Sequence, residues 1–323
     1  MGHRANLIII EKGEVSVYYD HWAANILDVE LFWGPKLARE FASQRDPLSP
    51  STEWLDETWC EGGAVLDFDT QSLLWFGGED VLFDVPTRRV HFEMMSTQWP
   101  GWALKWAGGH VVELGDYVGY PRGALLTGTG IDPRKVSPTS SFDGFATLIS
   151  VVQSGQLSLT GAGGGFGALQ LGTPQVQQIL NLPLSERLGW NGDLPKAGLH
   201  LDLDSKRLLA WLAHPECCVH ERVAPAWEGF EVEYVGDQFE RHLEVLGTSL
   251  SMPLRSKNAL WAERLDFIER HSMWEARNPV RDLPTSINVT EINPATDQVR
   301  GSVGTLTQKK RILEEVRKRQ PLG

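Results

Sequence analysis

Residues 64–74, Ala-Val-Leu-Asp-Phe-Asp-Thr-Gln-Ser-Leu-Leu, recur without a gap as residues 199–209, Leu-His-Leu-Asp-Leu-Asp-Ser-Lys-Arg-Leu-Leu. Each copy has an apolar run, a polar turn around an Asp-x-Asp pair and a second apolar run, which is the pattern of a β-hairpin. A match of this length suggests that the chain contains one ancestral unit twice.

Three further pairs of segments flank this match and recur in the same order. They are a hairpin with glycine in its turn (7–15 and 149–157), a stretch before a helical pattern (31–35 and 169–174), and a helix followed by a strand with alternating bulky side chains (86–119 and 215–247). Each unit therefore reads as hairpin, helix, hairpin, helix, strand. Because strands and helices mix without regular βαβ alternation, we expect an α+β fold with an internal duplication and a C-terminal helical extension.

The repeat sets the expected domain organisation. The predicted parts are a first α+β repeat (1–120), a linker rich in Gly, Pro, Ser and Thr (121–140), a second α+β repeat (141–248) and a helical extension (249–323). The extension holds an amphipathic helix at about 256–271 and a basic terminal helix at about 307–319. The polar, proline-broken stretch 278–304 between them is expected to be extended or disordered.

Composition and charge exclude several classes of protein. The net charge is −12, and the last 23 residues carry six basic and two acidic groups, so the first 300 residues carry −16. Such a body repels phosphate backbones, so we expect no nucleic-acid binding. No apolar run reaches the roughly 18 residues of a membrane helix, and the apolar run 7–10 is too short for a signal peptide. With three cysteines and no disulfide framework, the expected location is the cytoplasm.

The repeated Asp-x-Asp motif offers a first candidate site. The pairs Asp67/Asp69 and Asp202/Asp204 each place two carboxylates on one face of a strand, where they could bind a ligand or a divalent cation. However, each second aspartate adjoins a predicted turn, and aspartate is favoured there because it hydrogen-bonds the backbone. We favour the role in the turn.

Two histidines occupy equivalent positions in the repeat. If the units pack about a pseudo-twofold axis, His91 and His220 could face one cleft as general acid–base or metal-binding groups. No motif ties a nucleophile or carboxylate to either residue. The alternative, which we favour, is that a Val-His pair simply opens a helix in each unit.

Thirteen tryptophans are an unusually large number, and eight of them lie in the first unit. Most alternate with aliphatic residues, as core positions do. Trp22, Trp33 and Trp54 lie in loop-like contexts, so we predict that they are exposed and bind a partner.

Neither a metal site nor a cofactor is expected. The segment 214–220, His-Pro-Glu-Cys-Cys-Val-His, fits zinc-ligand spacing poorly. The glycine run 161–167 lacks the Lys-Ser/Thr of a phosphate-binding loop and is predicted to be a flexible connector. No catalytic motif is present.

Two function classes follow from these observations. The first is a non-enzymatic binding protein whose acidic body engages a basic protein partner, as an inhibitor, an immunity protein or an assembly factor does. The alternative is a small-molecule enzyme or sensor that uses the cleft between the repeats. A further alternative is that the second repeat serves only as scaffold. The sequence leaves the oligomeric state open.

Overall fold

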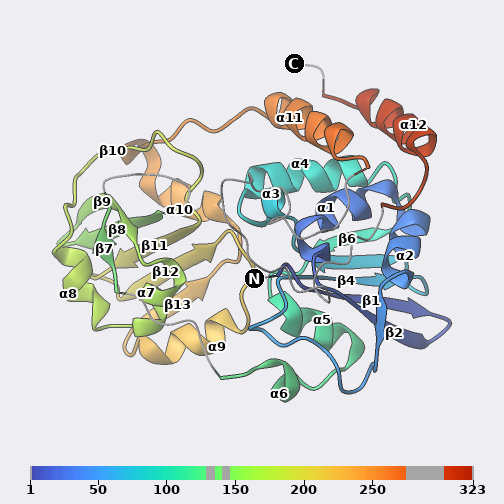
Figure 1. The fold of residues 1–323 in the computed structure, drawn as a ribbon. Coiled ribbons are helices and arrows are strands. Elements are labelled where there is room, and N and C mark those ends of the chain that lie inside the picture. The colour runs from blue at the N-terminus through green and yellow to red at the C-terminus, as the bar shows by residue number, and fades with distance from the viewer. Residues whose placement is uncertain (1, 129–134, 140–145, 274–301, 322–323) are drawn as a thin grey trace, which may run out of the picture. The chain divides into compact units, whose positions relative to one another are not determined.

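The computed structural model describes residues 2–128, 135–139, 146–273 and 302–321. The chain divides into two compact units (Figure 1). Unit 1 comprises residues 1–82, 86–127 and 256–323, and unit 2 comprises residues 83–85 and 128–255. Each unit is built around a six-stranded mixed sheet, so the α+β fold and the duplication predicted from the sequence are confirmed.

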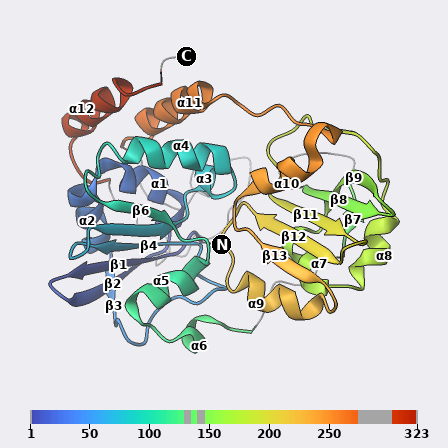
Figure 2. The same ribbon diagram turned by 180° about the vertical axis from the view of Figure 1, so that it is seen from behind.

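Unit 1 contains the sheet β3-β2-β1-β4-β5-β6. Its strands are β1 (Ala5–Glu11), β2 (Glu14–Asp20), β3 (Asp46–Leu48), β4 (Gly62–Asp67), β5 (Ser72–Phe76) and β6 (Ala103–Trp106). Its helices are η1 (Ala23–Asn25), α1 (Leu27–Glu30), η2 (Leu31–Trp33), α2 (Pro35–Ser43), α3 (Glu79–Leu82), α4 (Val85–Met95), α5 (His110–Val118), α6 (Arg122–Leu125), α11 (Lys257–Arg270) and α12 (Leu306–Arg317). In Figure 2, α4 and α5 lie on opposite faces of this sheet.

Unit 2 contains the sheet β13-β12-β11-β8-β9-β7 and a two-stranded sheet, β10-β14. Its strands are β7 (Ser137–Pro138), β8 (Thr147–Gln153), β9 (Gln156–Gly163), β10 (Leu188–Gly189), β11 (Ala197–Asp202), β12 (Arg207–Leu212), β13 (Glu231–Tyr234) and β14 (Leu250–Ser251). Its helices are α7 (Gly165–Leu171), α8 (Gln175–Leu180), α9 (Val219–Val223), η3 (Ala224–Ala226), α10 (Phe239–Leu246) and η4 (Gly247–Ser249). The glycine run predicted to be a flexible connector instead ends β9 and begins α7.

The two sheets share one register. Leu7 of β1 lies opposite Ala64 of β4, and the equivalent residues of unit 2, Ile149 and Leu199, are also paired. A buried tryptophan braces each unit in the same way. The indole of Trp99 donates to the carbonyl of Leu31 at 2.9 Å, and that of Trp227 donates to Leu169 at 2.8 Å. Matched strands and a matched long-range hydrogen bond are what a duplication predicts.

The segment predicted as a linker contains secondary structure and contributes to both units. Helix α6 belongs to unit 1, and the short strand β7 pairs with β9 at the edge of the sheet in unit 2. The edge strand of unit 1 has a different origin, because β3 follows β2 in the chain whereas β7 precedes β8. The strand at this edge therefore comes from between the two hairpins in unit 1 and from the segment before the first hairpin in unit 2.

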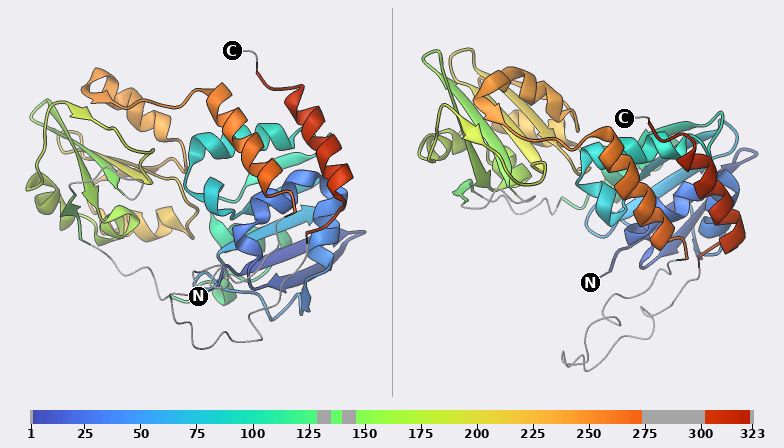
Figure 3. Two further views of the ribbon diagram at one scale, coloured as in Figure 1. Left: turned by 45° about the horizontal axis from the view of Figure 1, so that its top comes forward. Right: turned by 90° about the horizontal axis from the view of Figure 1, so that it is seen from above.

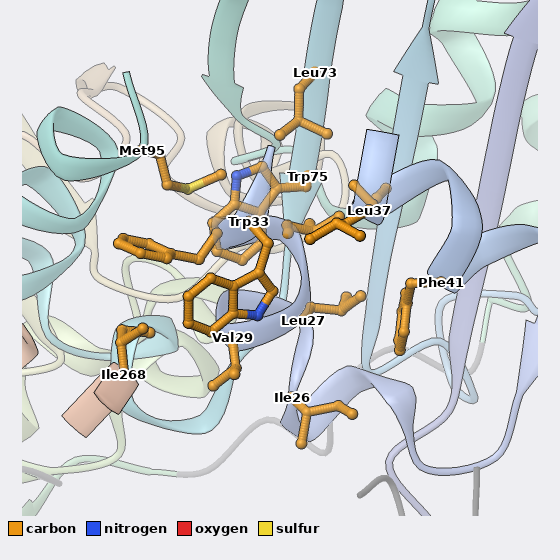
Figure 4. Close-up of a cluster of buried hydrophobic side chains, with 14 of the residues drawn as sticks. Ile26, Leu27, Val29, Trp33, Leu37, Phe41, Leu73, Trp75, Met95 and Ile268 are labelled. Carbon is orange, nitrogen blue, oxygen red and sulfur yellow. The ribbon is translucent and has the colours of Figure 1, made fainter. Parts of the chain in front are cut away.

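The C-terminal extension forms part of the core of unit 1. Figure 3 shows α11 and α12 side by side. Leu260, Trp261 and Ile268 of α11 and Leu313 of α12 join the same buried cluster as Trp33 and Trp75, part of which is drawn in Figure 4. The stretch 278–301 of the extension, predicted to be extended or disordered, lies outside the described residues.

Two buried cations tie these helices to α1. Arg264 of α11 pairs with Asp28, and Lys309 of α12 lies 4.0 Å from Glu30. Burial raises the pKa of Glu30 and lowers that of Lys309, each opposed by the other's charge. Removing one partner of such a pair leaves an uncompensated buried charge, which costs about 3–5 kcal/mol.

None of the helices among the described residues is long and apolar enough to cross a bilayer.

Candidate functional site

The three tryptophans predicted to be exposed are buried, so that prediction is wrong. Trp22 and Trp33 are 3% exposed and Trp54 is 8% exposed. The sequence around Trp22 and Trp33 looked loop-like, but Trp22 directly precedes η1 and Trp33 is the last residue of η2, and both side chains join the core of unit 1. Trp54 stacks on Tyr120, with ring centroids 4.7 Å apart. Among the tryptophans that the structure describes, Trp59 is the exposed one, at 53%.

The two equivalent histidines have different environments. His91 is fully buried within α4 and accepts a hydrogen bond from Arg264 at 3.1 Å. Burial, followed by the charge of Arg264, holds its pKa well below the ordinary range. His220 is exposed near the start of α9. The favoured expectation therefore holds for His220 but not for His91, because α4 begins at Val85.

The Asp-x-Asp pairs brace turns. Asp69 accepts from the backbone of Lys12 and Gly13, both at 2.7 Å, and Asp204 accepts from Ser154 and Gly155 at 2.8 and 2.7 Å. The first aspartate of each pair accepts from the backbone two and three residues further on. Within each unit, the second aspartate therefore joins the second hairpin to the turn of the first. This is the role in the turn that we favoured from the sequence.

A pocket in unit 2 is the strongest candidate for a functional site. It has a volume of about 230 Å³ and lies between α10 and the strands β11, β12 and β13. It is lined by the apolar residues Leu208, Leu209 and Val245, by His200 and by the charged residues Asp202, Arg207, Glu233, Arg241 and Glu244. The helix α10, which supplies one wall, lies against this sheet in Figure 1.

Behind the pocket, four side chains form one hydrogen-bonded chain. The indole of Trp211 donates to Nδ1 of His242 at 3.2 Å. The Oγ of Ser150 lies 2.7 Å from Nε2 of His242 and 2.8 Å from Nδ1 of His200. Trp211, Ser150 and His242 are buried, whereas His200 reaches the pocket with 8% of its surface exposed.

A glycine makes room for this chain. A Cβ atom on Gly198 would lie 2.0 Å from Nε1 of Trp211 and 2.6 Å from Nδ1 of His242. Such contacts are far inside van der Waals distance, so any side chain at Gly198 would separate the two rings. The equivalent Gly63 of unit 1 meets Leu114 in the same way, at 2.5 Å. The close packing of helix on strand is thus inherited, and the polar groups are specific to unit 2.

Unit 1 has apolar residues at the four equivalent positions. The pairs are Ile8 and Ser150, Val65 and His200, Phe76 and Trp211, and Leu114 and His242. All four residues of unit 1 are fully buried. Polar side chains in such a place are costly unless each is hydrogen-bonded, as these are.

Burial keeps both histidines of this hydrogen-bonded network, His200 and His242, neutral. It lowers the pKa of His200, with Asp202 opposing and Arg207 assisting. Burial, together with the repulsion that a protonated His200 would exert, lowers the pKa of His242 to about 3. The pocket therefore presents a neutral imidazole at physiological pH.

The pocket has an excess of negative charge. Arg207 lies 3.3 Å from Glu231, and Arg241 lies 2.9 Å from Glu233, so both guanidinium groups are already paired. Asp202 and Glu244 have no cationic partner among the described residues. Hydrogen bonds from Ser205, and then from the backbone of Asp204, lower the pKa of Asp202, so it is ionised.

The counterparts of these carboxylates in unit 1 are paired. Asp116, equivalent to Glu244, accepts three hydrogen bonds from Arg122 at 2.6–3.1 Å. Asp67, equivalent to Asp202, accepts from the hydroxyl of Tyr117 at 2.9 Å. Unit 2 has the shorter Val245 where unit 1 has Tyr117, so this hydroxyl has no equivalent over Asp202.

The lining of the pocket limits its chemistry. It contains no Ser, Thr, Cys or Lys side chain that could act as a nucleophile, and the hydroxyl of Ser150 is buried behind it. Within the part of the chain that the structure describes, no group of three or more His, Cys, Asp or Glu side chains is placed to hold a metal ion. The carboxylates of Asp202 and Glu244, together with the neutral imidazole of His200, are suited to holding a cationic group.

None of the residues of this pocket except Asp202 was identified from the sequence alone. The signal was nevertheless present, because the aligned repeat places Ser150, His200 and His242 at positions where unit 1 is apolar. Protein-family models, curated protein sequences and solved structures were compared with the chain, and none of them matches it. Function must therefore be inferred from the chemistry of the site.

Proposed function

We propose that this chain is a non-enzymatic binding protein that engages a basic protein partner by taking one arginine side chain of that partner into the pocket of unit 2. The observation that carries this proposal is the pair of carboxylates, Asp202 and Glu244, that line the pocket without a cationic partner among the described residues. They lie beside His200, which is 8% exposed and has no partner for Nε2 in the described parts of the chain.

Size and charge both favour a single cationic side chain. A volume of about 230 Å³ is below the roughly 300–1,000 Å³ of sites for drug-sized ligands. Guanidinium presents five donors in a planar fork that matches carboxylates, and arginine is a frequent anchor in protein interfaces. The net charge of −12 would also steer a basic partner toward the chain.

The sequence analysis named inhibitors, immunity proteins and assembly factors as classes with such a partner, and all three remain expectations. The alternative, a small-molecule enzyme or sensor, is narrowed here to a sensor of a small guanidinium compound in this same pocket. A ligand site in the cleft between the repeats, as the sequence analysis expected for this alternative, remains a prediction.

The proposal is tested by an NMR titration of the full chain with N-acetyl-L-arginine amide, following the backbone amides of β11 and α10. We expect saturable shifts with a Kd of about 1 mM, which corresponds to roughly 4 kcal/mol. The isosteric N-acetyl-L-citrulline amide, which lacks the charge, should not bind. Agmatine and N-acetyl-L-lysine amide serve as further probes.

The matched variants are Glu244→Gln in the pocket and Asp116→Asn at the equivalent position of unit 1. We expect the first to weaken binding about fivefold, since a half-exposed ion pair is worth about 1 kcal/mol, and the second to leave it unchanged. Equal binding of the arginine and citrulline probes would overturn the proposal. Much tighter binding of agmatine would favour the small-molecule sensor, and tighter binding of the lysine probe would change the recognised side chain.

A further inference from the structure

Trp211 determines the position of each proton in the series of hydrogen-bonded side chains behind the pocket. The indole of Trp211 can only donate, so Nδ1 of His242, 3.2 Å away, must accept and carries no proton. Neutral His242 therefore carries its proton on Nε2, which points at Ser150 Oγ, 2.7 Å away. With Ser150 Oγ accepting this bond, its own hydroxyl proton is left for the next group.

That next group is His200. Nδ1 of His200 lies 2.8 Å from Ser150 Oγ, and the hydroxyl has no other acceptor among the described residues. If Nδ1 of His200 carried a proton, the hydroxyl proton of Ser150 would be buried without an acceptor, and such groups are rare because they are costly. Nδ1 of His200 must therefore accept, which places the proton of the neutral imidazole on Nε2.

We infer that the hydrogen bonds from Trp211 through His242 and Ser150 fix His200 as a hydrogen-bond donor toward the pocket. The ligand therefore carries an uncharged acceptor oxygen beside its cationic group. Ser150, His242 and Trp211 act as positioning residues, because they select the tautomer without lining the pocket. The recognised class is then a guanidinium with a carbonyl within reach, as in an arginine residue of a polypeptide. This inference rests on the proposed function for its ligand, but not for its tautomer.

The identity of the neighbouring groups supports a fixed orientation. Around His242 lie His200, Ser150 and Trp211, none of which is charged at neutral pH. Around His200 lie Asp202 and Arg207, whose charges have opposing effects on it. In the free protein no strong charge therefore competes with the hydrogen-bonded chain in deciding which nitrogen of His200 is protonated.

The tautomer of His200 is determined by NMR of the full-length protein labelled with ¹⁵N-histidine. Long-range ¹H–¹⁵N spectra at pH 7.5 should show Nε2 protonated in both His200 and His242, with resonances assigned by His200→Gln and His242→Gln. In Trp211→Phe the donor that fixes His242 is lost, and we expect the population of the Nδ1–H form of His242 to rise. A spectrum with His200 protonated at Nδ1 would overturn the inference and leave the arginine proposal intact.

The ligand class is read from two probes of equal charge. N-acetyl-L-arginine amide carries carbonyl oxygens, whereas n-propylguanidinium carries none. We expect the second probe to bind about fivefold more weakly, which is the effect of one lost hydrogen bond. The difference should disappear in His200→Leu and persist in His200→Gln, which retains an N–H donor. Equal binding of both probes would overturn the acceptor requirement, while binding of neither would overturn the proposed function and this ligand class together.

Discussion

The two units have equivalent sheets but bury very different side chains on them. Beneath α5, unit 1 packs Ile8, Val65, Phe76 and Leu114, all without exposed surface. Beneath α10, unit 2 places Ser150, His200, Trp211 and His242 at the same positions and satisfies them with hydrogen bonds to one another. Apolar packing would have been the simpler way to keep a scaffold, so the polar set favours a function for unit 2 over the alternative that it has decayed.

The units also differ in what covers the carboxylates around this site. Unit 1 pairs Asp116 with Arg122 and covers Asp67 with Tyr117, whereas in unit 2 Glu244 and Asp202 line a pocket. Equivalent positions of the duplicated fold therefore differ in the partners of two carboxylates and in the polarity of the residues behind them. Backbone geometry need not change, as the shared register shows.

The largest expected effect concerns the extension, which stabilises unit 1. Replacing Arg264 by methionine (Arg264→Met) leaves Asp28 buried without its cation, so we expect unit 1 to lose about 3–5 kcal/mol of stability. The measurement is hydrogen exchange of the amides of β1 and β4. Arg270→Met, on the exposed side of the same helix, is the control and should change stability by less than about 0.5 kcal/mol. Similar effects of the two substitutions would contradict the role given to the buried pair.

The next effect tests the polar wall of unit 2 through pH. The pKa of His242 is lowered to about 3 in the folded protein. Below pH 6.5, His242 is therefore protonated in the unfolded chain but stays neutral in the folded chain. Its stabilising contribution is complete above pH 6.5 and is lost as the pH falls, by about 2 kcal/mol between pH 7 and pH 5. His200 acts in the same direction.

Hydrogen exchange of β11 amides at several pH values measures this loss within unit 2. In His242→Leu, which restores the residue of unit 1, the loss on acidification should shrink. Protection of β11 that stays constant from pH 7 to pH 5 in the unmodified chain would show that His242 is not held neutral.

A third prediction exchanges the residues that distinguish the two walls. In Val245→Tyr, the new phenol should fill the pocket and donate to Asp202 as Tyr117 donates to Asp67. We expect binding of N-acetyl-L-arginine amide to weaken at least about tenfold, or about 1.4 kcal/mol. The reciprocal variant, Tyr117→Val, should leave binding unchanged. Retention of full affinity in Val245→Tyr would place the ligand elsewhere.

The smallest effect tests what the units share. Asp69→Ala and Asp204→Ala each remove a carboxylate that accepts from two backbone amides of the neighbouring hairpin. Each should cost its own unit about 1 kcal/mol, measured by hydrogen exchange of the hairpin amides. A large cost in one unit and none in the other would show that the shared turns differ in importance.

The sequence predicted the shared part of the molecule well. Asp-x-Asp at one spacing and glycine at another mark turns locally, so the hairpins and the duplication were visible without coordinates. The short helices around Trp22 and Trp33 were missed because their local pattern is loop-like, and their burial comes from the sheet beneath them. The partnership of Arg264 with Asp28 spans 236 residues and has no local signal.

The candidate site was missed for a different reason. Its chemistry lies in substitutions relative to the other unit, and each of them is ordinary when it is considered alone. A histidine at position 200 sits in a normal strand pattern, and only its comparison with Val65 marks it as a polar residue in an apolar place. Pairing across the sheet then brings it beside Ser150.

The most direct test of the central claim gives unit 2 the buried residues of unit 1. The variant carries Ser150→Ile, His200→Val, Trp211→Phe and His242→Leu, and its binding of N-acetyl-L-arginine amide is measured by NMR titration. We expect the β8–β11 pairing to persist, since cores tolerate apolar replacements of suitable volume. Binding of the probe should weaken about fivefold, because the hydrogen-bond donor on His200 is lost while Asp202 and Glu244 remain. A folded variant that binds the probe as tightly as the unmodified chain would contradict the claim that the buried polar residues of unit 2 contribute to recognition at the pocket.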